Sequence, residues 1–135
     1  MIRFFLIFLI SILGQNSSLY LQRYAHFSAV LASALPTLSI ALFSALLPET
    51  LGSFWLEELP LIFFGASFAG MSQQHRLPNL PGQLVSALIF ASLFFAQSQF
   101  FKGFGGALGT SACIAVLSSM ALQELYAYGK KKWNP

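Results

Sequence analysis

The chain has 135 residues, of which 56% are hydrophobic and only 8% are charged. Since a water-soluble domain usually carries about a quarter charged residues, this composition excludes an ordinary soluble globule. The seven basic and four acidic residues are also too few and too scattered to indicate a nucleic-acid-binding protein. We therefore expect a single integral membrane domain over residues 1–135, whose main partner is the lipid bilayer.

The first segment, residues 1–14, combines a basic residue, Arg3, with a run of apolar residues. This pattern is typical of a secretory signal, but no small-x-small cleavage site follows, and apolar character resumes at residues 19–21. We therefore expect an uncleaved first helix spanning residues 4–20, with a cleaved signal as the alternative.

A second span is expected at residues 27–47, which carry no charge. Pro36 lies near its centre and should kink the helix, because it cannot donate the hydrogen bond to the carbonyl of Ala32. The hydroxyls of Ser33 and Thr37 flank this break and can satisfy the freed carbonyl groups. Alternatively, the same hydroxyls line a weakly polar pathway.

Residues 48–60 are more polar and hold three of the four acidic residues, Glu49, Glu57 and Glu58. The segment also contains Trp55, whose amphipathic ring favours the membrane interface, so it indicates an extramembrane loop or a short surface helix. Its last residue, a proline, suits the first turn of the next helix, where it removes no intrahelical hydrogen bond.

The third apolar segment, residues 61–71, is too short to span a bilayer alone, so we expect a span of residues 59–75 across a locally thin membrane. Small residues four apart predict close contact with another helix: Gly65 with Ala69, and Ala66 with Gly70. A re-entrant half-helix is the alternative. A polar loop should follow at residues 72–83, because it contains Pro78, Pro81 and Gly82.

The last two spans are expected at residues 84–101 and 103–124, joined by a tight hairpin at Lys102. The final span starts with small residues, among which Gly105 and Gly109 form a GxxxG pair. This pattern predicts the most tightly packed helix of the protein, with residues 59–75 as its natural neighbour. The single cysteine, Cys113, is expected to be packed within it.

The chain is thus predicted to be an all-α polytopic transmembrane bundle of about five helices, or four spans plus a short re-entrant segment. Basic residues concentrate on the cytoplasmic side of membranes, which favours a cytoplasmic C-terminus in a bacterial inner membrane. Arg3 is the exception, since a basic start prefers the inside. The cytoplasmic set is Arg23, Arg76, Lys130, Lys131 and Lys132, against Arg3 and Lys102 outside.

No pattern in the sequence indicates an enzyme, a metal site or another cofactor. His26 and His75 lie in different predicted loops, with no Cys, Asp or Glu at ligand spacing. The chain has no Asp, and His and acidic residues occur in the predicted spans only at their ends, which disfavours nucleophilic catalysis and a proton relay through the bilayer. A lipid enzyme that uses His75, Arg76 and Asn79 is one further hypothesis.

The leading hypothesis for function is a small transporter or channel subunit that acts as a homo-oligomer, because about five short helices enclose little volume. The alternative is a non-transporting accessory or scaffold subunit of a larger membrane complex. Candidate residues for the pathway, or for helix packing, share small size or a hydroxyl group: Gly65, Ser67, Gly70, Gly105, Gly106, Gly109 and Thr110, with Ser33 and Thr37 opposite.

Overall fold

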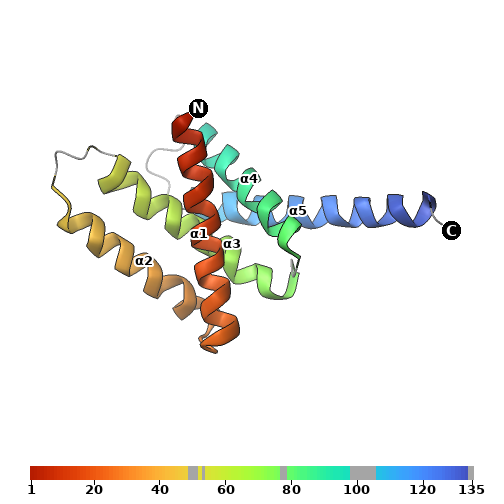
Figure 1. Cartoon of the computed structure of the whole chain (residues 1–135), viewed down its shortest axis with the longest axis horizontal. Helices are drawn as coiled ribbons and strands as arrows, with labels where there is room; N and C mark the ends of the chain where they lie inside the picture. The colour runs from red at the N-terminus through yellow and green to blue at the C-terminus, as the bar shows by residue number, and fades with distance from the viewer. Residues whose placement is uncertain (49–51, 53, 77–78, 98–105, 134–135) are drawn as a thin grey trace.

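The computed structural model describes residues 1–48, 52, 54–76, 79–97 and 106–133, with side chains except at 73–76, 97 and 132–133. Of the described residues, 92% are helical and none is in a strand, which confirms the predicted all-α class. Figure 1 shows the five helices, which are α1 (Ile2–Tyr24), α2 (Ala29–Leu46), α3 (Leu59–Arg76), α4 (Leu80–Gln97) and α5 (Gly106–Trp133).

Three of the described helices, α1, α2 and α5, are long and apolar enough to cross a membrane. The apolar part of α4, Leu80–Ala96, is shorter than a membrane span, and α3 is in neither category. Helix α3 ends in four polar residues, 73–76, and lies at the centre of the bundle. It contacts α1, α2, α4 and α5, so protein rather than lipid covers most of its surface.

The helix ends differ from the prediction where prolines were expected to break the chain. The predicted loop at 72–83 is wrong, because α3 continues to Arg76 and α4 already begins at Leu80. Pro81 and Gly82 therefore lie in the first turn of α4, where a missing N–H removes no intrahelical bond. The predicted hairpin at Lys102 lies outside the described residues, as does Pro78.

The start of α3 follows the expectation for Pro60, whereas in α2 the hydroxyls flanking Pro36 bond to carbonyls other than that of Ala32. Helix α2 is continuous across Pro36, and the Thr37 hydroxyl donates to the Ser33 carbonyl at 2.7 Å. The Ser33 hydroxyl donates in turn to the Val30 carbonyl at 3.0 Å. Pro60 lies in the first turn of α3, directly after a short π-helical turn, Phe54–Glu58.

Helices α1 and α3 run parallel, with their backbones in direct contact. Arg3 forms an ion pair with Glu58 beside the start of α3. Further along, a Cβ atom placed on Gly70 would lie 2.6 Å from the Gln15 carbonyl oxygen and 3.0 Å from the Ser18 Cβ. A Cβ placed on Gly14 would likewise lie 2.9 Å from the Phe63 carbonyl oxygen, so only glycine fits at either point.

Helix α5 is not the tightly packed helix that its glycines predict. Among the described residues, it contacts only α3 and α4, and Figure 1 shows its C-terminal half extending beyond the other helices. A Cβ placed on Gly106 or Gly109 would meet no other described atom within 4 Å. The face that packs is built from alanine, serine and valine instead: Ser111, Ala112, Ala115, Val116 and Ser119.

Replacing Gly70 with Ala should lower the free energy of unfolding by about 1–3 kcal/mol, because the added methyl group meets backbone that cannot move aside. Gly106→Ala is the matched control, since its methyl group enters open space and should leave stability unchanged or slightly raised. Unfolding in mixed micelles, followed by circular dichroism, measures both variants. Equal losses at the two positions would contradict the contact between α1 and α3.

Candidate functional site

A row of polar side chains lies inside the protein along one face of α1. Ser11, Gln15, Ser18 and Gln22 are spaced four, three and four residues apart, which places them on the same side of a helix. Ser11 and Ser18 are 0% exposed, Gln15 is 1% exposed and Gln22 is 7% exposed. We call these four residues the α1 polar row.

The α1 polar row faces the small residues of α3, and Ser11 and Gln22 of this row bond to backbone carbonyl groups. Gln22 Nε2 donates to the Ser18 carbonyl at 3.2 Å and reaches the Gly70 carbonyl of α3 at 3.4 Å. The Ser11 hydroxyl donates to the Ile7 carbonyl at 2.7 Å. A polar group in lipid costs several kcal/mol when it lacks a partner, so these bonds favour an inward-facing row.

Buried polar groups continue on the other helices around α1. Gln83 and Ser86 are buried on α4, and the Ser67 hydroxyl on α3 donates to the Phe64 carbonyl at 2.7 Å. The buried Ser119 hydroxyl of α5 donates to the Gly82 carbonyl of α4 at 2.7 Å, which links these two helices. The interior therefore contains uncharged polar side chains beside its apolar core.

The chemistry of this interior is that of hydroxyl, amide and carbonyl groups. Within the described ranges, no group of three or more His, Cys, Asp or Glu residues is placed to hold a metal ion. Among the residues whose side chains are described, the buried polar ones are all Ser or Gln, which carry no charge. Such groups can bind helices to one another or coordinate a neutral solute, but they do not supply a general acid or base.

The described candidate residues lie on three helices, α2, α3 and α5. Among the described residues, α2 contacts α1 and α3 but not α5, so Ser33 and Thr37 do not lie opposite the glycines of α5 as predicted. Gly65, Ser67, Gly70 and Ser33 are buried, Thr37 is half-buried, Gly106, Gly109 and Thr110 are exposed, and Gly105 lies outside the described residues.

Two groups of residues differ from the sequence-based interpretation. The α1 polar row was missed, although its spacing of four, three and four within an apolar segment was a readable signal. Cys113 was expected to be packed, but it is exposed.

The hypothesis of a lipid enzyme stays a prediction, since the side chains of His75 and Arg76 are outside the described set.

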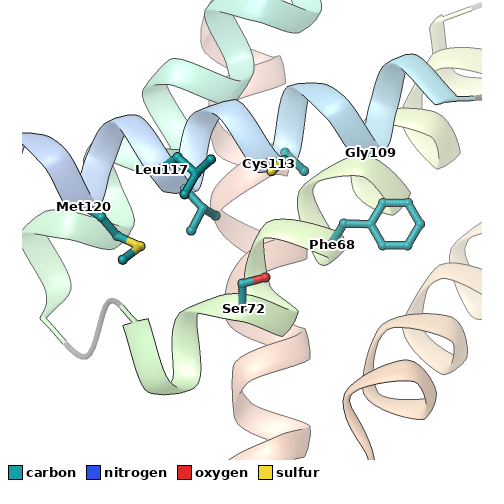
Figure 2. Close-up of a pocket in the computed structure, with 8 residues that line it drawn as sticks. Phe68, Ser72, Gly109, Cys113, Leu117 and Met120 are labelled. Atoms are coloured by element: carbon teal, nitrogen blue, oxygen red, sulfur yellow. The ribbon is translucent and has the colours of Figure 1, made fainter.

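A groove of about 430 Å³ lies between α3 and α5. Figure 2 shows Gly109, Cys113, Leu117 and Met120 following one another along α5, above Phe68 and Ser72 of α3. Ala112 and Val116 complete its lining. No polar residue of the interior described above contributes to the groove, which therefore forms a separate feature.

Comparison with known proteins places the chain in no group, since no family, no curated protein and no solved structure matches it.

Replacing Ser119 with Ala should lower the free energy of unfolding by about 0.5–1.5 kcal/mol, because it removes the bond to Gly82 and leaves that carbonyl less satisfied. Ser92→Ala is the control, since the Ser92 hydroxyl is exposed and bonds within its own helix. Unfolding in lipid bicelles compares the two variants. If Ser92→Ala were as destabilising as Ser119→Ala, the hydrogen bond between α4 and α5 would make no specific contribution to the free energy of unfolding.

Proposed function

We propose that this chain is a subunit of a transporter or channel in a bacterial inner membrane, with a pathway formed between several copies. The observation that carries this proposal is the exposure of Gly106, Gly109 and Thr110, which are the described pathway candidates on α5. A path through a single copy is disfavoured, because the backbones of α1 and α3 already touch at Gly70.

The exposed start of α5 has the chemistry that such a pathway needs. No atom of the described residues lies within 4 Å of a Cβ placed on Gly106 or Gly109, so the helix of another copy can approach this backbone closely. The Thr110 hydroxyl donates a hydrogen bond to the Ala107 carbonyl of its own helix at 2.9 Å. Its oxygen can still accept a hydrogen bond from a solute. Neutral solutes, or ions coordinated by oxygen, are the substrates that match this uncharged surface.

The packing of α1 and α3 supports the proposed cytoplasmic C-terminus. Because these helices run parallel, Arg23 near the end of α1 and Arg76 at the end of α3 lie towards the same side. Arg3, the basic residue that opposes this orientation, is paired with Glu58, which offsets its charge. The basic residues at the ends of α1 and α3 thus favour the cytoplasm for these ends, and in a topology of five spans the C-terminus lies on the same side.

A second candidate, an accessory subunit without transport activity, is favoured by the C-terminal half of α5. Leu122, Leu125, Tyr126 and Tyr128 are between 51% and 75% exposed. In a membrane, this half of the helix offers an apolar surface on which a helix of a different subunit can pack.

Purified protein in liposomes should conduct glycerol, measured by swelling, or K⁺, measured by efflux. Gly106→Leu should reduce either flux at least tenfold, because the larger side chain fills the space where copies are proposed to meet. Gly129→Leu is the control, since Gly129 is equally open but lies near the far end of α5. An absence of both fluxes, together with co-purification of another polypeptide, would overturn transport and support the accessory subunit.

A further inference from the structure

The contact between α1 and α3 is symmetric in its register. A Cβ placed on Gly14 would lie 3.0 Å from the Ala66 Cβ, and a Cβ placed on Gly70 would lie 3.0 Å from the Ser18 Cβ. In both pairs, the residue of α3 follows its partner on α1 by 52 positions, from 14 to 66 and from 18 to 70. Two helices related by a two-fold axis make contacts of this kind, so α1 and α3 occupy equivalent positions.

The two equivalent helices differ in what covers their outer faces. On α3, Phe68 and Ser72 lie against α5 (Figure 2). The residues 52 positions earlier, Asn16 and Tyr20 of α1, are exposed. Among the described residues, α1 and α5 of one chain make no contact. The outer face of α1 thus corresponds to the face of α3 that packs on α5, but no helix of the same chain covers it.

Helix α5 also has a face that its own chain leaves exposed. Thr110, Leu117 and Glu124 are exposed and follow one another at intervals of seven residues, which places them on one side of the helix. Ala112 and Ser119, which are buried within the chain, lie on the opposite side. The exposed side is apolar or uncharged over most of its length and ends in a carboxylate.

Charge limits what can cover this side of α5. Among the described residues, neither Glu124 nor Arg23 is in an ion pair, whereas Arg3 is already paired with Glu58. A carboxylate at the edge of a membrane is stabilised by a nearby cation. Of the described side chains on α2, α3 and α4, none is charged. The exposed face of α1, by contrast, carries Arg23 one turn beyond Tyr20.

We propose that the exposed side of α5 packs on the outer face of α1 in a second copy, with an ion pair between Glu124 and Arg23. In a topology of five spans, α1 and α5 cross the membrane in the same direction, so both charges lie on the same side. The two faces differ, so the contact is heterologous, and repeating it closes a ring if the rotation between copies allows. The inference rests on the homo-oligomer of the proposed function and names the surfaces through which its copies meet.

The contact is tested by disulfide cross-linking of full-length protein in vesicles, in a Cys113→Ser background. Tyr20 and Ala121 each precede the charged residue of their helix by three positions, so Tyr20→Cys with Ala121→Cys should give a cross-linked dimer on mild oxidation. Phe5→Cys with Ala121→Cys is the control. Phe5 lies on the same exposed face of α1, but about 27 Å from Arg23 at ~1.5 Å per residue, and should give little dimer.

The ion pair is tested by reversing its charges in the cross-linking pair. Glu124→Arg should reduce the yield of dimer about tenfold, because it places two cations together. Adding Arg23→Glu should restore the yield, which separates loss of the ion pair from loss of folding. Lys131→Gln is the control for a change of charge alone and should leave the yield unchanged.

Three outcomes would overturn the proposal. The first is an absence of dimer with Tyr20→Cys and Ala121→Cys. The second is a dimer that forms equally with Ala121→Cys alone, which would show that α5 meets α5. The third is a loss in Glu124→Arg that Arg23→Glu does not restore. Flux through wild-type protein without the dimer would leave the transport proposal standing and remove this interface, whereas the dimer without flux would confirm the interface and overturn transport.

Discussion

The contact between the backbones of α1 and α3 determines the arrangement of the other helices. At Gly70, the two backbones are so close that even a methyl group has no room beside the Gln15 carbonyl. This approach brings α3 to the centre, where it contacts the four other helices. Because protein covers α3 on several sides, its sequence does not have to be as apolar as that of a helix surrounded by lipid.

Around this contact, the protein places polar groups inside and apolar groups outside. The α1 polar row is buried against α3, whereas large apolar side chains such as Leu38, Leu42 and Phe43 of α2 are exposed. In water this distribution would be unfavourable, but in a bilayer the exposed side chains meet hydrocarbon and the buried amide of Gln22 bonds to carbonyl groups of α1 and α3. The same logic leaves α5, which is apolar and only partly covered, free to interact with lipid or with other chains.

The fold class and the number of helices could be predicted from the sequence, because they depend on composition, whereas the loop predicted around Pro81 lies within the first turn of α4. Which glycines pack against another helix could not be predicted from the sequence. Gly70 and Gly109 both belong to small-residue patterns, and such a pattern shows only that close approach is possible. Which neighbour occupies the space depends on tertiary structure. The predicted first span, residues 4–20, contains three of the four residues of the α1 polar row, but their shared position on one buried face of the helix was not recognised.

The most direct test of this account is a nuclear Overhauser measurement on the protein in lipid nanodiscs, with selective labelling of Gly70 and Ser18. The account predicts a strong contact between the Gly70 Hα protons and the Ser18 Hβ protons, because a Cβ placed on Gly70 would lie 3.0 Å from the Ser18 Cβ. Absence of this contact in folded protein, with Gly109 instead in contact with α1, would contradict the central position of α3.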